Sequence, residues 1–405
     1  MTNKAPYLAV GLVVGVPLAI YGLFLGLAAV PFFQRHFLYA HKFSTIWLPG
    51  TDLNDPQRWG FAKNQATPFT LTTADNQTLH AWHILPLSTY QQHESSLVSQ
   101  PTGLSNDITT TQNFKLLQDD PSAKLIISFH GNAGHLLQSL RPRLYHTLSD
   151  SNYHVLALSY RGFGLSTGSP TEAGLIIDAA TAVNFAVQTA GIPPSRIVLL
   201  GHSLGTAVAS GVSELSTAAR EGADFAGVVL VAPFSSLPTM LSGYSIAGYL
   251  PVLRPLVWWP WLLDRVMDRV VDKWDSAGRW GRIVREIIKA HGEGGRRRRR
   301  LRLSLLHARN DWDIPCHEDD KIFRAAVGGL LQDGREADDE WFKREKEART
   351  ERLGTDAFVS TWKEGDVEIR QELVPWGGHN DVAFSAPVML AIMRCFDTEV
   401  AETIS

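Results

Sequence analysis

Short apolar runs recur through the middle of the chain and alternate with longer stretches that have a helical pattern. The runs are residues 124–129, 155–159, 197–200, 227–231 and 303–306. Continuous apolar runs of this length are typical of strands buried on both faces of a parallel sheet. Residues 174–190 and 204–219 have the length and alanine content of crossover helices. The alternation predicts an α/β fold with a mostly parallel, doubly wound sheet.

A second pattern is the long apolar stretch near the N-terminus. No charged residue occurs between Lys4 and Arg35, and the run from Tyr7 to Phe33 is mainly Leu, Val, Ala, Gly and Phe. Because about 20 apolar residues cross a bilayer, we predict one transmembrane helix over about 7–33. A cleaved signal peptide is the alternative, but its apolar core is usually only about 7–15 residues long. The prediction divides the chain into an anchor, 1–40, and an α/β domain, 41–400.

The side of the membrane is less clearly encoded than the span itself. Lys4 precedes the apolar stretch, whereas Arg35 and Lys42 follow it, so the positive charges favour neither orientation. The glycosylation sequon that begins at Asn76 favours a lumenal domain. We therefore predict a single-pass protein of the endoplasmic reticulum membrane with a lumenal α/β domain.

Two segments precede the main alternation: a predicted hairpin and a polar stretch. Residues 68–73 and 79–85 are predicted strands of a hairpin that turns at Asp75 and Asn76. Residues 94–122, rich in Ser, Thr, Gln, Asn and Asp, are predicted to form a surface loop or an insertion.

Two further insertions lie in the second half of the chain. Residues 236–295 form an apolar insertion, which we interpret as a cap. It contains Trp258, Trp259 and Trp261, which either touch a bilayer as a lid or pack on the domain. The charged segment 332–366 is predicted to form a solvated surface helix with a following loop.

Composition narrows the function classes. The 405 residues are 44% hydrophobic and 20% charged with a net charge of -3, which gives no overall electrostatic basis for binding nucleic acid. Cys316 and Cys395 allow at most one disulfide, and no clustered metal-ligand or cofactor motif occurs. The basic run from Arg296 to Arg300, with Arg302, either binds anionic lipid head groups or forms a solvated loop.

The motif Gly-His-Ser-Leu-Gly at 201–205 follows a predicted strand and opens a predicted helix. In this G-x-S-x-G context the serine sits in a strained turn above the sheet, and side chains at the glycine positions would clash with neighbouring backbone. Ser203 is therefore the candidate nucleophile, against the alternative of a packed serine in a glycine-rich crossover.

A serine nucleophile needs a base and an acid, which follow it in the chain in folds of this type. Asp311 and Asp313 lie in the loop after strand 303–306, and Asp313 could instead cap a helix. His379 follows the apolar stretch 368–374 and is the candidate base. The other histidines are interpreted as structural or as supports of the triad residues, because none follows the acid at the end of a final strand; they include His130, His135, His202, His307 and His317.

Hydrolysis also needs donors for the oxyanion of the tetrahedral intermediate. The backbone N–H of Leu204, directly after the nucleophile, is the first predicted donor. The glycine-rich loop after strand 124–129 offers the second, which we assign to Asn132. A plain glycine-rich turn is the alternative for this loop.

Taken together, four ordered motifs carry a family resemblance. The motifs are HGNAG at 130–134, YRGFG at 160–164, GHSLGT at 201–206 and HARND at 307–311. They resemble the membrane-anchored α/β-hydrolase-domain monoacylglycerol and lysophospholipid lipases. The resemblance favours Asp311 over Asp313, by its spacing to Ile314 and Pro315, and implies a triad of Ser203, Asp311 and His379. The tryptophan-rich cap, the arginine run and the 332–366 insertion have no counterpart in that pattern.

The resemblance implies a membrane-bound serine hydrolase of the α/β-hydrolase fold, cleaving the acyl ester of monoacylglycerols or lysophospholipids. An acyl-protein thioesterase would use the same triad, but the long cap favours a lipid substrate. A non-catalytic membrane scaffold is a third possibility, but it gives no reason for the ordered triad and oxyanion loops. The triad needs neither a cofactor nor a metal, and the pattern indicates no oligomeric state.

Overall fold

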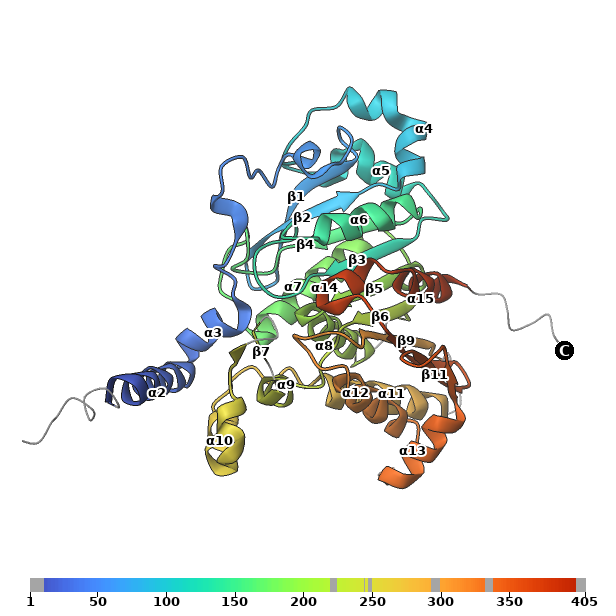
Figure 1. Ribbon diagram of the computed structural model, residues 1–405. Helices are drawn as coiled ribbons and strands as arrows, with labels where there is room; N and C mark the ends of the chain where they lie inside the picture. The colour runs from blue at the N-terminus through green and yellow to red at the C-terminus, as the bar shows by residue number, and fades with distance from the viewer. Residues whose placement is uncertain are drawn as a thin grey trace, which may run out of the picture.

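One ten-stranded sheet organises the computed structural model, which describes residues 11–218, 224–243, 245–246, 250–292, 299–331 and 338–397. The strand order is β1-β2-β4-β3-β5-β6-β9-β12-β11-β10 (Figure 1). The strands are β1 (Ala66–Thr72), β2 (Thr78–Ile84), β3 (Leu125–Phe129), β4 (His154–Leu158), β5 (Ile197–His202), β6 (Gly227–Val231), β9 (Leu301–Ala308), β10 (Thr350–Arg352), β11 (Phe358–Glu364) and β12 (Val367–Val374). Neighbouring strands from β4 to β12 in this order are parallel, and the pairs beyond them at both edges are antiparallel. The predicted mostly parallel α/β sheet is confirmed.

Helices cover both faces of the sheet and create two separate apolar cores (Figure 1). Successive residues of a strand point to opposite faces, so Leu125 and Ile127 of β3 join one core while Ile126 joins the other. The helices of the first core are α7 (Glu172–Asn184), α8 (Leu204–Ala218), α11 (Ser276–Gly292) and α12 (Glu318–Gly328), and those of the second are α6 (Arg141–Asp150) and α15 (Ala386–Phe396). Burial on both faces explains why these strands are continuously apolar.

The N-terminal apolar stretch differs from the predicted helix. Residues 1–10 lie outside the described part of the chain, and the rest forms η1 (Gly11–Gly15), α2 (Val16–Ala28) and α3 (Pro31–Tyr39). The helical path bends by 101° between α2 and α3. Val30 has an extended backbone because proline disfavours helical geometry in the residue before it, and Pro31 then begins a new helix.

The single transmembrane helix predicted over 7–33 is therefore not found within 11–33, the described part of that range. In the described residues no one helix is both long and apolar enough to cross a bilayer. Taken together, the bent pair of α2 and α3 has the required length and apolar composition.

Two segments predicted to be irregular contain regular structure. The polar segment 94–122 includes the end of α4 (Leu87–Val98) and all of α5 (Gln112–Gln118), and it buries Leu97, Phe114 and Leu117. Spaced apolar residues on one face are enough to dock these helices even though most positions are polar. The predicted surface loop is therefore wrong for this part of the chain.

The charged segment 332–366 is also more ordered than predicted. Its surface helix is present as α13 (Asp339–Ala348), whereas residues 332–337 lie outside the described part. The predicted following loop is instead the pair of strands β10 and β11, which extends the sheet beyond β12. Val359 and Trp362 are buried there, while the charged residues cluster at the hairpin end of β11.

The insertion 236–295 combines surface and core elements. It contains α9 (Leu237–Gly243), β7 (Ser245–Ile246), β8 (Leu250–Pro251), η7 (Arg254–Trp258), α10 (Pro260–Asp268) and α11. Trp258 is 85% exposed, and Trp259 and Trp261 are also exposed. By contrast, Trp280 of α11 is fully buried and donates from Nε1 to Ser210 Oγ at 2.8 Å. The tryptophan cluster thus does not pack on the domain, whereas the end of the insertion is part of the helical layer.

Candidate active site

The turn between β5 and α8 places Ser203 at the carboxyl edge of the sheet. Ser203 has φ of +53°, in the left-handed region that non-glycine residues rarely adopt. A Cβ at Gly205 would lie 1.9 Å from Phe129 O, and one at Gly201 would lie 2.5 Å from Gly205 O. Both glycines are therefore required by close backbone approach, which is the reason given by the sequence motif.

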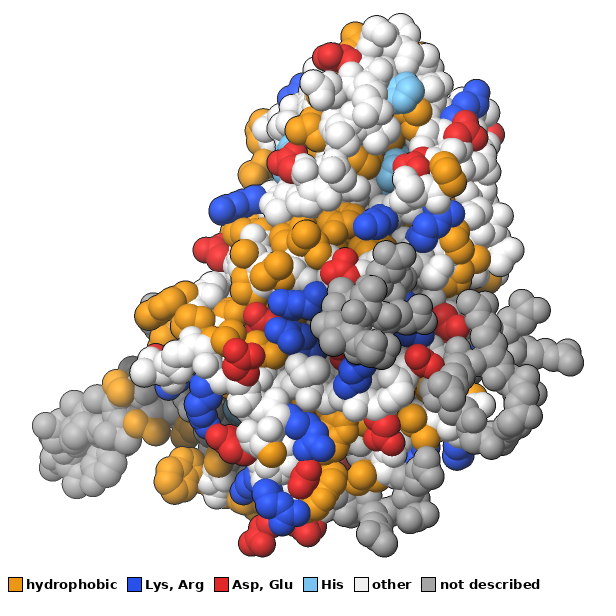
Figure 2. All heavy atoms as spheres, turned by 90° about the vertical axis from the view of Figure 1, so that its right-hand side faces the viewer, with side chains coloured by type: hydrophobic (Ala, Val, Ile, Leu, Met, Phe, Trp, Pro, Cys, Tyr) orange, Lys and Arg blue, Asp and Glu red, His pale blue; other side chains and the backbone are white. Residues whose placement is uncertain are grey.

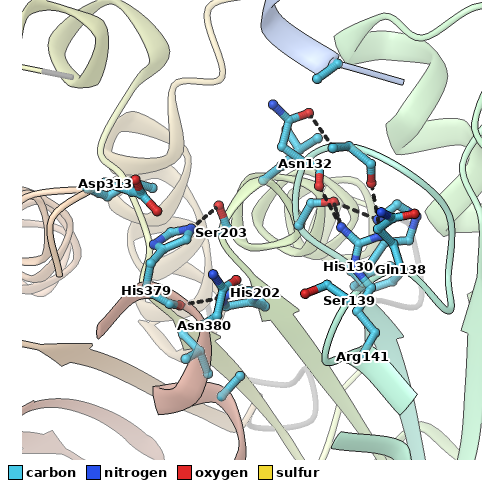
Figure 3. Close-up of a pocket in the computed structure, with 18 of the residues that line it drawn as sticks. His130, Asn132, Gln138, Ser139, Arg141, His202, Ser203, Asp313, His379 and Asn380 are labelled. Carbon is cyan, nitrogen blue, oxygen red and sulfur yellow. Dashed lines mark hydrogen bonds between the residues drawn. The ribbon is translucent and has the colours of Figure 1, made fainter. Parts of the chain in front are cut away.

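Three side chains from separate strand ends form one hydrogen-bonded chain. Ser203 Oγ lies 2.9 Å from His379 Nε2, and His379 Nδ1 lies 2.8 Å from Asp311 Oδ2. Figure 3 shows the imidazole of His379 turned toward the Ser203 hydroxyl. When Nδ1 carries the proton and donates it to Asp311, Nε2 is free to accept from Ser203. The structure thus brings together the three residues that the sequence singled out.

The loop that carries His379 is fixed to the loop that carries Asp311. His379 lies in the short helix α14 (Gly378–Asp381), preceded by Gly377 with φ of 135°. Gly378 N donates to Asn310 Oδ1 at 2.8 Å. The ring nitrogen Nε2 of His202 lies 2.7 Å from the backbone carbonyl oxygen of His379. These contacts hold the imidazole in place from both sides.

The carboxylate of Asp311 is surrounded by donors. Its Oδ1 accepts the backbone N–H groups of Asp313 and Ile314, both at 2.9 Å. Its Oδ2 lies 3.1 Å from His307 Nε2 as well as near His379. Burial would raise the pKa of Asp311, but the hydrogen bonds from His307 and His379 outweigh it and hold that pKa well below its usual range. The group is therefore ionised and oriented.

A buried histidine supports the acid from behind. His307 is fully buried between two carboxylates, with Nδ1 2.6 Å from Asp319 Oδ1 and Nε2 near Asp311. Burial would lower the pKa of His307, but the charge of Asp319 and the bonds to Asp311 and Asp319 raise it well above its ordinary value. His307 is thus an imidazolium that donates from both nitrogens. The contact with Asp311 agrees with the second of the two roles expected for His307, support of the triad, and its place in HARND, four residues before Asp311, was the available signal.

Asp313, the competing acid, lies on another side of His379. Its backbone bonds to Asp311, and its side chain lines the cavity beside the Ser203–His379 pair (Figure 3). One potential ligand atom each from Asp311, Asp313 and His379 lies within 4.8 Å of the others. The bond between Asp311 and His379 already accounts for this grouping. Asp313 contributes no oxygen to the chain that runs from Ser203 to Asp311.

The loop from His130 to His135 faces Ser203 from across the cavity. A Cβ at Gly131 would lie 3.2 Å from Ser203 Cβ, so the backbone that leads to Asn132 passes directly beside the nucleophile. Leu204, the other predicted donor, is the first residue of α8. The first N–H groups of a helix have no partner within the helix. Both predicted oxyanion donors thus border the cavity that contains Ser203.

Arg141 holds this loop through its carbonyl groups. Its Nη2 donates to Gly131 O at 2.9 Å and Asn132 O at 2.6 Å, and its Nη1 donates to Ala133 O at 3.0 Å and also to His135 O. Burial lowers the pKa of Arg141 to about 10, which leaves it charged near neutral pH. No sequence pattern pointed to this arginine.

The N-terminal helices also reach the loop. Asn132 Nδ2 donates to Leu38 O at 2.8 Å, and Ala133 N donates to Tyr39 O at 3.2 Å. Phe37, Leu38 and Phe43 line the cavity. The segment predicted to be only an anchor is therefore part of the wall around Ser203.

A single cavity of about 480 Å³ joins these parts, within the range of small-molecule sites. Its polar end holds Ser203, His379 and the loop of Asn132. Apolar side chains line much of the rest, including Phe37, Leu38, Phe43, Leu237, Met240 and Ile314. The cavity can therefore accommodate an apolar group next to a nucleophilic serine.

The remaining sequence candidates have other environments. Arg300 and Arg302 donate to carbonyl groups at the end of α15, among them Cys395 O, so they fix the start of β9. The rest of the basic run, 296–298, lies outside the described residues. Cys316 and Cys395 are both free thiols, so no disulfide joins them.

Comparisons with known proteins agree with this arrangement. Residues 120–313 match the family model described as "Serine aminopeptidase, S33". Protein ABHD12B of Homo sapiens is 42% identical over 113 residues, 28% of this chain and 30% of that protein. The lysophosphatidylserine lipase ABHD12 of Rattus norvegicus is 25% identical over 278 residues, 68% of this chain and 60% of that protein. Protein bem46 of Schizosaccharomyces pombe is 33% identical over 140 residues, 34% of this chain and 44% of that protein.

The sheet and these matches are those of a protein with the α/β-hydrolase fold. The resemblance of the chain to the lipases of the α/β-hydrolase family is confirmed by the family model and the relatives named above. The alignments span less than two thirds of the length of each of these relatives.

Proposed function

We propose that this protein cleaves the acyl ester of a monoacylglycerol or lysophospholipid, with Ser203 as nucleophile, His379 as general base and Asp311 as the orienting acid. The observation that carries the proposal is the continuous chain of hydrogen bonds from Ser203 Oγ through His379 to Asp311. Residues bonded in this order convert a weakly nucleophilic hydroxyl into a reactive one.

The chemistry follows from the positions of these atoms. Ser203 Oγ attacks the acyl carbonyl carbon while its proton passes to His379 Nε2, and the carbonyl oxygen becomes an oxyanion that Leu204 N–H and Asn132 N–H stabilise. The ester C–O bond then breaks, and His379 returns the proton to the departing glycerol oxygen. Water next attacks the acyl-enzyme by the same route, which releases the fatty acid and restores Ser203.

Two features support a lipid as the source of the ester. The cavity has apolar walls next to Ser203, and α3 contributes Phe37 and Leu38 to them. The rat relative bears the name of a lipase for lysophosphatidylserine. An acyl chain would occupy the apolar part of the cavity while its ester carbonyl lies between Ser203 and the Asn132 loop.

The distribution of exposed apolar side chains supports work at a membrane surface. Exposed residues of this kind are concentrated on α2, on α3 and from the end of η7 to the start of α10; they include Leu18, Ile20, Leu23, Phe32, Trp258, Trp259 and Trp261. These helices extend from the same side of the molecule (Figure 1), and Gln34 Nε2 of α3 donates to Arg269 O, next to α10, at 2.7 Å. The side facing away from α2 carries acidic, basic and hydrophobic side chains intermixed (Figure 2).

Activity-based labelling tests the proposal. Membranes that contain the wild type, Ser203→Ala or His379→Ala are treated with a fluorophosphonate probe, and monoacylglycerol hydrolysis is followed in parallel. We expect labelling and hydrolysis in the wild type and the loss of both in the two variants. Labelling without lipid turnover would move the substrate toward acyl thioesters or small esters, and a wild type that does neither would refute the enzyme and favour a scaffold.

A further inference from the structure

We propose that Asp313 makes this cavity selective for acyl esters with an uncharged, hydroxyl-bearing head group over esters whose head group carries a phosphate. The proposal rests on the proposed function and narrows it, because a monoacylglycerol would be preferred to lysophosphatidylserine. The charged groups that border the cavity distinguish the two head groups.

The cavity offers a substrate no available guanidinium or ammonium group from its described lining. Arg141 is the one arginine or lysine among the described lining residues. All four N–H groups on its two terminal nitrogens are used by backbone carbonyls of the Asn132 loop, at Gly131, Asn132, Ala133 and His135. Arg141 therefore faces the loop and not a head group.

The histidines of the lining do not supply a positive charge either. Burial lowers the pKa of His130 well below its ordinary value and that of His202 to about 3, so both rings are neutral near pH 7. His379 is engaged between Ser203 and Asp311. A phosphate that entered this cavity would find no free cation among these groups.

Asp313, in contrast, presents a carboxylate to the cavity. It is the one acidic residue in the described lining, and no hydrogen bond to its side chain occurs among the described residues. Figure 3 shows this side chain beside His379 and Ser203, so it borders the space into which the alcohol part of the ester must project. Asp311, its neighbour, is already saturated by donors.

The two head groups differ in how they meet this carboxylate. Glycerol hydroxyls donate hydrogen bonds, and a carboxylate accepts them through two oxygens. A phosphate brings negative charge and acceptor oxygens to the same place, so it meets like charge in a partly desolvated site. Burial raises the pKa of Asp313. Its carboxyl group accepts from a hydroxyl in both protonation states, and in the ionised state it also repels a phosphate. Head-group charge thus decides which ester this cavity holds.

Substrate pairs with the same acyl chain test this inference. The kcat/KM values for a monoacylglycerol and for lysophosphatidylserine are measured with the wild type, Asp313→Asn and the control Asp381→Asn. Asp381 is exposed, follows His379 by two residues and does not line the cavity. We expect the wild type to favour the monoacylglycerol at least tenfold. Asp313→Asn should reduce this ratio at least fivefold, mainly through a lower KM for lysophosphatidylserine, and Asp381→Asn should leave it within twofold.

A short neutral ester without a lipid head group tests whether each variant still folds and retains a working triad. Hydrolysis of p-nitrophenyl butyrate by the control Asp381→Asn should keep its kcat within threefold of the wild-type value, and Asp313→Asn is measured on the same ester. If Asp313→Asn alters kcat equally for all three esters, Asp313 acts through His379, and the inference is wrong. An unchanged ratio of the two lipids, or a wild-type preference for lysophosphatidylserine, would overturn it as well.

A binding measurement separates this inference from the proposed function. Non-hydrolysable ether analogues of the two lipids are tested for protection of Ser203 against the fluorophosphonate probe. If neither lipid is hydrolysed but the glycerol ether protects at least tenfold better, and Asp313→Asn removes that difference, the lipase function fails and the selectivity stands. Equal protection by both ethers would refute the selectivity whatever the turnover.

Discussion

The two sides of the cavity are built in different ways. The Ser203 side is made from loops at the carboxyl ends of β5, β9 and β12, and charged groups fix it, because Asp311 lies between His307 and His379. The Asn132 side is a loop without regular structure, which Arg141 and the N-terminal segment hold through its backbone. The reactive groups are thus fixed by the sheet, whereas the predicted donor Asn132 depends on Arg141 and the N-terminal segment, which no sequence motif marks.

The largest effect is expected for the acid on the Ser203 side. Asp311→Asn should lower kcat for a short ester about 10⁴-fold, because an amide in this place favours the wrong tautomer of His379. Asp313→Asn is the matched variant, two residues away, and should change the same kcat by less than threefold. Steady-state kinetics with p-nitrophenyl butyrate compares the two. A greater loss in Asp313→Asn would transfer the role of the acid to Asp313.

The next effect concerns stability on the same side. His307→Gln removes a buried cation between Asp311 and Asp319, which should cost about 3–5 kcal/mol because two carboxylates remain buried without it. The free energy of unfolding is measured by urea denaturation of wild type and variant at several pH values.

The sign of the pH dependence follows from the raised pKa of His307. The stabilisation by a group whose folded-state pKa is raised is complete below its unfolded pKa, near 6.5, and declines as pH rises through the folded value. The wild-type advantage over His307→Gln should thus be largest near pH 6 and shrink at higher pH. An advantage that grows above pH 7 would show that His307 is neutral. The control His317→Gln, at an exposed site, should change stability by less than about 0.5 kcal/mol.

A smaller, kinetic effect is expected on the Asn132 side. Arg141→Gln should lower kcat by about 10²–10³-fold with little change in KM, because a displaced loop loses an oxyanion donor that acts mainly in the transition state. Arg196 is a matched control, since it also donates to backbone carbonyls, those of Asp120 and Pro121, but lies before β5 and away from the cavity. Arg196→Gln should leave kcat within twofold. Equal losses in the two variants would mean that Arg141 only supports folding.

The same contrast explains what the sequence could and could not predict. The central strands, Ser203 and His379 could be selected because each of the two residues follows an apolar strand, whereas Asp311 and Asp313 share such a position and only the family resemblance favoured Asp311. Their roles remain a prediction that the geometry supports. Asp319 and Arg141 could not be selected, because their partners are brought to them only by folding.

The errors in the fold have local physical causes. The strand β11 was hidden because its exposed hairpin end is charged, and α5 because most of its positions are polar. Pro31 carried the signal for the break in the N-terminal helix, but the apolar composition on both sides of it favoured one continuous span. Patterns of hydrophobicity thus identify buried elements well and their interruptions poorly.

The smallest effect tests whether the N-terminal segment supports the Asn132 loop. Tyr39 accepts at its hydroxyl from Trp274 Nε1 at 3.2 Å and donates to Asp272 Oδ2 at 2.7 Å, while its carbonyl accepts from Ala133. Tyr39→Phe removes the hydroxyl and keeps the ring, and should cost about 1–2 kcal/mol of stability. Because the hold on Ala133 is loosened only indirectly, kcat for a short ester should fall about two- to fivefold.

Tyr90→Phe is the control. It removes a buried tyrosine hydroxyl that bonds to Lys63 O far from the cavity, and it should lower stability without changing kcat. If Tyr39→Phe matches Tyr90→Phe in kcat, the N-terminal segment lines the cavity without positioning the loop.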